Sequence, residues 1–188
     1  RYTSFRNVIG AFELMSPEEG TRFSGVTAGP LDSVRVVEDG EVRSVVEVLF
    51  RYGDSFAVVH YKLPKRGTEV EIGLRVFWNE KSRMLKLSVP TPHADAEYLG
   101  QVAYGVESFP TNGREVVAQK WTAVVSRDRD FALTCINEGT YGSDFADGEA
   151  RLSLLRGAAY AGHPIAERPI VPQDRFTPRI DQGERLFR

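Results

Sequence analysis

The sequence has very little cysteine, no glycosylation signal and no long apolar run. Its single cysteine, Cys135, cannot close a disulfide within the chain. No Asn-x-Ser/Thr acceptor site occurs, and no apolar run approaches the roughly 20 residues that cross a bilayer. These absences favour a cytoplasmic protein in a reducing setting that does not contact a membrane.

A surplus of positive charge is also lacking. The chain carries 24 Lys and Arg against 26 Asp and Glu, which leaves a net charge of −2. A nearly neutral chain has no basic field to attract nucleic acid, so we expect no nucleic-acid partner. The sequence begins without Met and without a signal-peptide core, from which we expect a piece cut from a longer chain.

What the sequence does contain is a succession of strand patterns separated by turn residues. In 68–78, apolar residues that end at Trp78 alternate with mostly polar ones, which predicts a strand with one buried face. Trp78 and Trp121 are therefore expected in the core. The dipeptide Asp39-Gly40 predicts a hairpin turn with positive φ angles. Further strands are expected at 33–37, 42–52, 56–63, 84–89, 115–125, 131–136 and 152–155.

These connections are too short for helical crossovers, so the sheets are expected to be antiparallel. The pattern predicts an all-β fold, an antiparallel β-sandwich, with no helix longer than two turns. We expect the 188 residues to form one domain. It has a leading segment over 1–32, the main sandwich strands over 33–156 and a Pro-rich, irregular C-terminal tail over 157–188.

Few residues suggest catalysis. The three histidines are dispersed, and His93-Ala94-Asp95 stands in a proline-rich loop without a second histidine pair, which favours a solvated loop over a metal site. His60 lies within a predicted strand. Cys135 stands in an apolar strand with no residue beside it that would activate a thiol. We therefore expect no catalytic residue, no metal and no cofactor in this chain.

Two predicted loops are more suggestive, because they hold aromatic residues beside glycines. They cover 104–113 and 137–147. Glycine allows a tight backbone path there, and an aromatic ring on such a loop can fill a groove on a sugar or on a neighbouring domain. The candidate contact residues are Tyr104, Phe109, Asn137, Tyr141 and Asp144.

Several segments, in their order, resemble the C-terminal half of glycoside hydrolase family 38, the α-mannosidases. One is the stretch over 132–142, which matches an apolar strand of the family followed by Asn-x-Gly and Tyr-Gly. The others are Val36-Val37-Glu38-Asp39-Gly40, Val76-Phe77-Trp78-Asn79-Glu80-Lys81, Met84-Leu85-Lys86-Leu87-Ser88-Val89-Pro90, Tyr104-Gly105-Val106, Gln119-Lys120-Trp121, Leu152-Ser153-Leu154-Leu155-Arg156 and Asp181-Gln182-Gly183.

This resemblance implies an accessory β-sandwich of the supersandwich, galactose-mutarotase-like type. It also implies an N-terminal catalytic barrel in the same protein, which would hold the zinc and the catalytic carboxylates of a retaining α-mannosidase. The chain would then pack on that barrel, shape a site for an α-mannoside, and be inactive alone. Where relatives carry an arginine before a proline, this chain has Ser108-Phe109 ahead of Pro110.

Two other classes of function stay open. A stand-alone carbohydrate-binding module would show exposed aromatics and sugar affinity without a barrel. A purely structural interface module would show a large apolar patch and no sugar affinity. A homo-oligomer also stays open.

Overall fold

The computed structural model describes residues 10–25, 29–81, 83–157 and 182–188, and it confirms an all-β, antiparallel fold with one short helix in these ranges. The contacts divide the chain into two compact units. We call the described residues of 9–81 and 159–188 the six-stranded unit, and those of 82–158 the sandwich unit. The prediction of a single domain over 1–188 stays a prediction.

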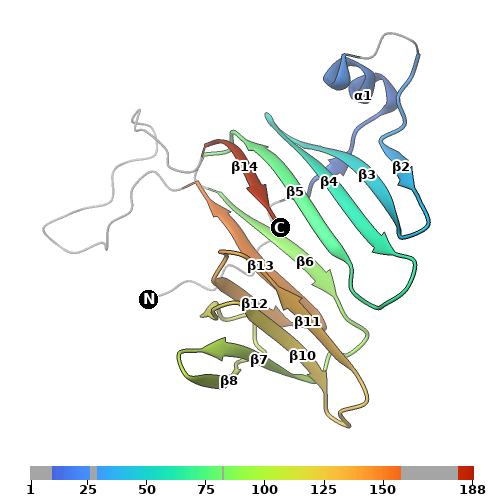
Figure 1. The fold of residues 1–188 in the computed structure, drawn as a ribbon. Coiled ribbons are helices and arrows are strands. Elements are labelled where there is room, and N and C mark those ends of the chain that lie inside the picture. Colours follow the sequence, from blue (N-terminus) through green and yellow to red (C-terminus); the bar gives the residue numbers. More distant parts are fainter. Residues whose placement is uncertain (1–9, 26–28, 82, 158–181) are drawn as a thin grey trace, which may run out of the picture. The chain divides into compact units, whose positions relative to one another are not determined.

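The six-stranded unit consists of one antiparallel sheet and one helix (Figure 1). The order in the sheet is β1-β3-β4-β5-β14, and β2 pairs with β3 beside β1. The elements are β1 (Glu13–Leu14), α1 (Pro17–Ser24), β2 (Val34–Asp39), β3 (Arg43–Tyr52), β4 (Ser55–Pro64), β5 (Glu71–Trp78) and β14 (Gly183–Phe187).

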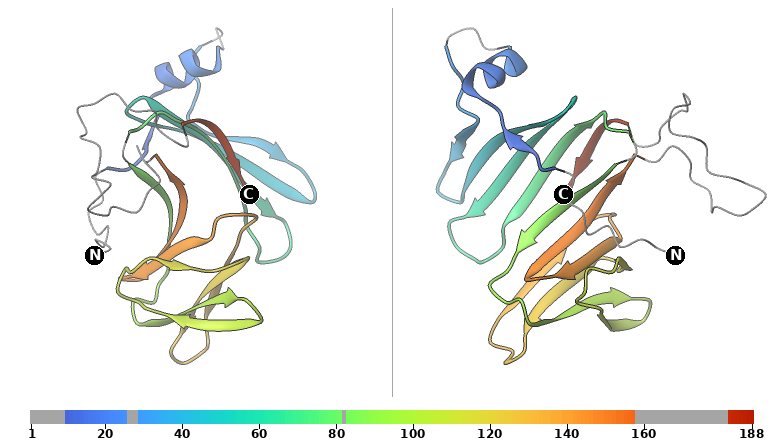
Figure 2. Two further views of the ribbon diagram at one scale, coloured as in Figure 1. Left: turned by 90° about the vertical axis from the view of Figure 1, so that its left-hand side faces the viewer. Right: turned by 180° about the vertical axis from the view of Figure 1, so that it is seen from behind.

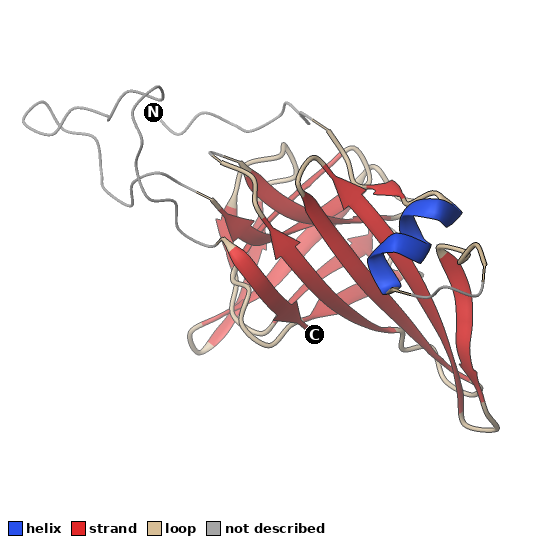
Figure 3. Cartoon of the chain, turned by 90° about the horizontal axis from the view of Figure 1, so that it is seen from above, coloured by secondary structure: helices blue, strands red, loops and turns tan. Residues whose placement is uncertain are grey.

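Helix α1 is short but well delimited. Ser16 Oγ accepts a hydrogen bond from the Glu19 amide (3.2 Å), and the Glu19 carboxylate accepts one from the Ser16 amide (2.8 Å). This reciprocal pair satisfies two helix-terminal donors, and Gly25 ends the helix with φ 69°. The helix lies against one face of the sheet (Figure 3), where the ring of Phe23 meets that of Phe56 at 4.6 Å.

The opposite face of this sheet is apolar, as the alternation in β5 predicts. Leu74, Val76 and Trp78 are buried on it, with Trp78 only 2% exposed. The strand begins later than predicted, at Glu71, so Val70 is exposed and does not share this face. Trp121, the other expected core anchor, is only partly buried.

The hairpin between β2 and β3 forms, but the prediction of its turn geometry was wrong. Gly40, within the described range 29–81, does not adopt a positive φ, and its amide donates to the Arg43 carbonyl (3.0 Å). The register of β2 against β3 shifts between Val36 and Glu38, which marks a bulge in β2.

The sandwich unit consists of two four-stranded antiparallel sheets, with orders β11-β10-β7-β8 and β6-β13-β12-β9 (Figure 2). Their strands are β6 (Met84–Pro90), β7 (Ala96–Val102), β8 (Gly105–Phe109), β9 (Val116–Val117), β10 (Trp121–Ser126), β11 (Ala132–Ile136), β12 (Gly142–Ala146) and β13 (Glu149–Arg156).

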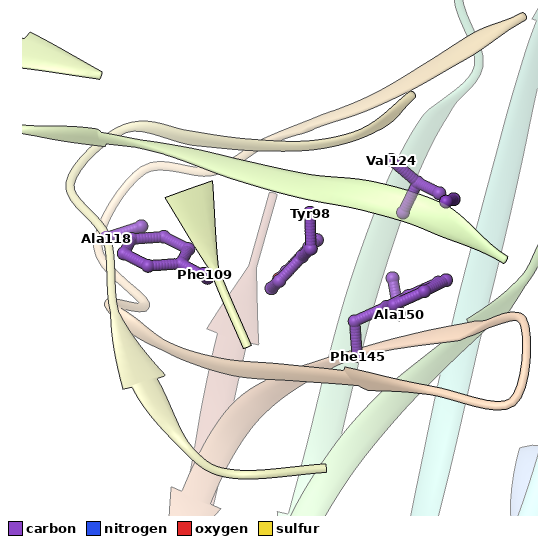
Figure 4. Packing of buried hydrophobic residues seen from close by; sticks show 7 residues of the cluster. Tyr98, Phe109, Ala118, Val124, Phe145 and Ala150 are labelled. Carbon is purple, nitrogen blue, oxygen red and sulfur yellow. The ribbon is translucent and has the colours of Figure 1, made fainter. Parts of the chain in front are cut away.

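Aromatic rings join the two sheets. Tyr98 from β7 stacks on Phe145 from β12, with ring centroids 5.5 Å apart, and Phe109 packs against Tyr98 at 5.9 Å. Ala96, Ala118, Val124 and Ala150 complete the buried cluster. Figure 4 shows the three rings lying between the strands of this core. Burial raises the pKa of Tyr98, an effect that outweighs the opposing influence of the Ser143 and Thr122 hydroxyls.

Three sequence predictions need correction here. The predicted loop 104–113 contains β8, and the predicted loop 137–147 contains β12. The prediction of an irregular tail over 157–188 is wrong for Gly183–Phe187, which forms β14 and pairs with β5. The tail residues 158–181 lie outside the described residues. In the described part of the chain, no helix is long and apolar enough to cross a membrane.

We expect Trp78→Ala to destabilise the chain strongly, because the indole fills space at the buried end of β5. Removing a large buried aromatic side chain costs about 3–5 kcal/mol. Denaturant unfolding of the 188-residue chain would measure the loss. Val42→Ala is the matched control, because Val42 is 79% exposed and its truncation should stay within about 0.5 kcal/mol. Equal stability of both variants would contradict the prediction.

Candidate functional site

One end of the sandwich unit gathers the loops that contain most of the predicted contact residues. The Ala118 amide donates to the Tyr141 carbonyl (2.8 Å), and the Asn137 amide donates to the Lys120 carbonyl (2.9 Å). The Gln119 amide donates to the Gln101 carbonyl (2.8 Å), near the end of β7. These bonds tie 118–120 and 137–141 to β7, whose hairpin with β8 turns at 103–104. Three connections thus meet at this end, over 103–104, 118–120 and 137–141. We call it the Tyr141 end.

Exposed apolar side chains concentrate at the Tyr141 end. Within 83–157, the large apolar residues that remain exposed all lie there, on the three connections or on strand residues next to them. They are Tyr104, Val106, Val117, Ile136 and Tyr141. Single exposed apolar residues are ordinary, but a group of them at one end of a unit is a candidate interaction surface. We call these five residues the Tyr141 patch.

Tyr104 is the most exposed member of this patch. It lies in the two-residue turn between β7 and β8, where Val102 pairs with Gly105. Its φ is 62°, a left-handed conformation that is uncommon for residues other than glycine. The turn therefore holds an aromatic side chain outward at some cost in backbone strain, a feature that often accompanies functional loops.

Asn137 shapes the connection that carries Tyr141. Its Oδ1 accepts hydrogen bonds from the amides of Gly139 (3.2 Å) and Thr140 (3.0 Å), an arrangement that folds the chain sharply after β11. The residue is 8% exposed, whereas Tyr141, at the far side of the turn, is 54% exposed. Buried Asn137 thus fixes the conformation of the loop, and Tyr141 is the residue of the loop whose side chain is exposed to solvent.

Asp144 lies in β12 and is buried within an ionic network. Its Oδ1 accepts from Arg151 Nε (2.7 Å), and its Oδ2 pairs with Lys86. Lys86 also pairs with Glu115, which accepts from Ser153. Both oxygens of Asp144 are therefore engaged by cations from neighbouring strands. This arrangement suits a role in holding β6, β12 and β13 together.

Phe109 does not join the exposed group. It ends β8 at the other end of the hairpin, and its ring lies in the buried core against Tyr98. Of the five predicted contact residues, the structure therefore exposes Tyr104 and Tyr141, on two connections at the same end of the unit. It buries Asn137 at that end, and it places Phe109 and Asp144 inside the unit.

The residues considered for catalysis in the sequence make packing contacts and ion pairs within the unit. The ring of His93 packs against Phe131 at 4.9 Å, and Asp95 accepts from Arg127 Nε (3.1 Å). Burial raises the pKa of Cys135, which keeps its thiol protonated. Among the described residues, no group of three or more His, Cys, Asp or Glu could hold a metal ion. A zinc ion of the kind the resemblance implies therefore finds no ligand set in these ranges.

Sequence reasoning missed Val106, Val117 and Ile136 as surface residues. Val117 and Ile136 belong to apolar stretches typical of core strands, whereas Val106 stands in the predicted loop 104–113. Ile136 pairs with Trp121, and Val117 pairs with Gly142 on the edge strand β9. The alternation in β11 contained a usable signal, because Leu133 and Cys135 point inward and Ile136 therefore points outward.

Two stacked antiparallel sheets, joined by a small aromatic core and ending in an exposed apolar patch, define a β-sandwich module. The chain belongs to glycosyl hydrolase family 38, as its C-terminal domain: the family model described as "Glycosyl hydrolases family 38 C-terminal domain" matches residues 1–171. No curated protein matches the chain. The resemblance inferred from the sequence is thereby confirmed, and the chain is an accessory domain of a glycoside hydrolase.

The contribution of the Asn137 side-chain hydrogen bonds to stability can be tested. We expect Asn137→Ala to lower the free energy of unfolding by about 1–3 kcal/mol, because it leaves two amides near a buried position without their acceptor. Asn112→Ala is the matched control. Asn112 Oδ1 also accepts from the amide two residues ahead (3.2 Å), but this bond is exposed and water can replace it. Equal losses in chemical denaturation would refute the assignment.

Proposed function

We propose that this chain is the accessory domain of an α-mannosidase-like hydrolase, and that its Tyr141 end packs on the N-terminal catalytic barrel of the same protein. A family 38 C-terminal domain implies a catalytic domain ahead of it. The observation that carries the proposal is the Tyr141 patch, whose exposed apolar residues lie together at one end of the sandwich. A surface of this kind gains free energy when a neighbouring domain covers it.

The composition of the patch fits an interface that lies close to a sugar site. Tyrosine is enriched at interfaces because a large apolar ring ends in a hydroxyl that can still hydrogen-bond. Tyr104 and Tyr141 could therefore pack on the barrel through their rings and direct a hydroxyl toward the substrate rim. Three aliphatic side chains on edge strands of the two sheets, Val106, Val117 and Ile136, would add apolar contacts with the barrel.

In this proposal the chain shapes the site and the barrel performs the chemistry. Retaining hydrolysis of an α-mannoside needs a carboxylate nucleophile and a second carboxyl group as acid and base. The barrel would supply both, and it would also hold the zinc ion. The part of Tyr104 and Tyr141 is to narrow the rim and to fix the sugar in place, which lowers the cost of reaching the reactive geometry.

The first test is made on the full-length protein. Tyr141→Ala is expected to lower kcat/KM for an aryl α-mannoside by about tenfold, because a contact at the rim is lost. The same change in the 188-residue chain should leave its stability nearly unchanged, since Tyr141 is half exposed there. Val42→Ala, on the six-stranded unit, serves as the control and should leave kcat/KM unaltered. A large loss of stability in the chain would instead show that Tyr141 serves the sandwich core.

The second test concerns the chain alone. We expect no turnover of an aryl α-mannoside by the purified 188-residue chain, with or without added zinc. The two-step mechanism requires a positioned carboxylate to form the glycosyl-enzyme, and the proposal places that carboxylate in the barrel. Hydrolysis that rises with zinc and clearly exceeds a blank would overturn this division of labour.

A further inference from the structure

A groove lies on the face of the six-stranded sheet against which α1 packs. Its volume is about 370 Å³, within the range of roughly 300–1,000 Å³ found for small-ligand sites. All of its lining residues belong to the six-stranded unit, so the groove is separate from the Tyr141 end. The end of α1 borders it through Phe23 and Ser24, and the strands β2, β3, β4, β5 and β14, with Arg188 directly after β14, contribute the rest of its lining.

A row of hydrogen-bonding groups crosses this groove. Arg35, Glu47 and His60 are register neighbours on β2, β3 and β4. Arg35 Nε donates to Glu47 Oε1 (3.0 Å), and His60 Nε2 lies 2.8 Å from Glu47 Oε2. Burial by itself would raise the pKa of Glu47, but the hydrogen bonds from His60 and Arg35 outweigh it and hold this pKa below its usual value. Donors and an anionic acceptor are thus fixed side by side.

The fourth member of the row is a glycine. Gly73 pairs with His60 in the middle of the sheet, and a Cβ built on it would approach His60 Cβ only at 3.9 Å. Its φ is not in the left-handed region, so neither crowding nor backbone geometry requires glycine. Glycine inside a strand weakens the strand and often marks the close approach of another group. At this position it keeps the floor of the groove open.

The next row of the sheet is mostly apolar. Val58, Arg75 and Leu186 are register neighbours on β4, β5 and β14. Val58 and Leu186, together with Phe23, give the groove an apolar side next to the polar row, and Arg75 adds a charged group there. A ligand held between the two rows would need hydroxyl groups on one edge and C–H groups on the other.

Three of the four Lys and Arg side chains that line the groove form ion pairs with carboxylates, and Arg188 is the fourth. Lys62 pairs with Glu71, Arg75 pairs with Glu184, and Arg35 pairs with Glu47. Paired charges of this kind offer many donors and acceptors but little net field for a free anion. Guanidinium and carboxylate groups held in a row match the adjacent hydroxyls of a polyol. We therefore propose that the groove binds a neutral hexopyranose unit.

In this complex the edge of the sugar that carries adjacent hydroxyls meets Arg35, Glu47 and His60. The C–H face of the ring lies over Gly73 and Val58. The choice of mannose as the first probe rests on the proposed function, whereas the site itself rests on the groove. Binding of mannose to the chain and the effect of Tyr141→Ala on the full-length enzyme can therefore fail independently.

The test is a titration of the isotope-labelled 188-residue chain, followed by amide chemical shifts. Separate samples receive methyl α-mannoside, glucose, glucuronate or inorganic phosphate. We expect saturable shifts with a neutral hexose at the amides around His60 and Gly73. Gly73→Val should weaken this binding at least tenfold, because the methyl groups of the valine fill the floor of the groove. The variant should still fold, because a β-branched residue is favoured in a strand. Gly40→Val is the matched control, at a turn outside the groove where a Cβ meets nothing closer than 3.8 Å.

A second variant keeps the test decisive if Gly73→Val does not fold. Arg35→Leu removes the donor at one end of the polar row, on the edge strand β2, and should also weaken binding at least tenfold. Three results would overturn the proposal: no shifts with either neutral hexose at tens of millimolar, shifts with glucuronate or phosphate only, or hexose binding that both groove variants retain.

Discussion

The stack of Tyr98 on Phe145 is the contact on which the sandwich unit depends. It joins β7 of one sheet to β12 of the other at a centroid distance of 5.5 Å, and Phe109 extends it sideways. Gly100, also on β7, makes room for this arrangement, because a Cβ there would collide with the ring of Phe109. Because so few large side chains lie between the two sheets, these ring contacts set the distance between the sheets. That spacing in turn fixes where the connections at the Tyr141 end emerge.

Much of the six-stranded unit could be predicted from the sequence, because β2 to β5 follow one another through short turns and β5 alternates apolar with mostly polar residues. The sandwich unit was harder to predict, since its strands are short and its glycines suggest loops. Asp147-Gly148 shows what was overlooked. Both residues have positive φ angles, 53° and 78°, and Ala146 pairs with Glu149, so this dipeptide makes the tight hairpin that was expected at Asp39-Gly40. A dipeptide predicts a turn well, but its flanking strands decide the geometry.

The candidate site could be predicted only in part, for a physical reason. Sequence indicates that an aromatic residue stands near a glycine, and this was enough to single out Tyr104 and Tyr141. It does not indicate which end of a hairpin an aromatic residue occupies, and this separates buried Phe109 from exposed Tyr104. One partner of Asp144, Arg151, lies only seven positions later in the adjacent strand, but the other, Lys86, lies 58 positions earlier. Pairings of this kind become visible only when the sheet order is known.

The bulge in β2 has a consequence for how the chain behaves among copies of itself. This strand lies at an edge of its sheet and exposes Val34, Val36 and Val37, a combination that invites pairing with the edge of another molecule. The register shift between Val36 and Glu38 interrupts the regular row of amide and carbonyl groups that such pairing needs. Glu38 and Asp39 add negative charge directly after it. The irregular edge thus disfavours strand pairing between molecules and the fibrous self-association that would follow, although apolar side chains at this edge are exposed to solvent.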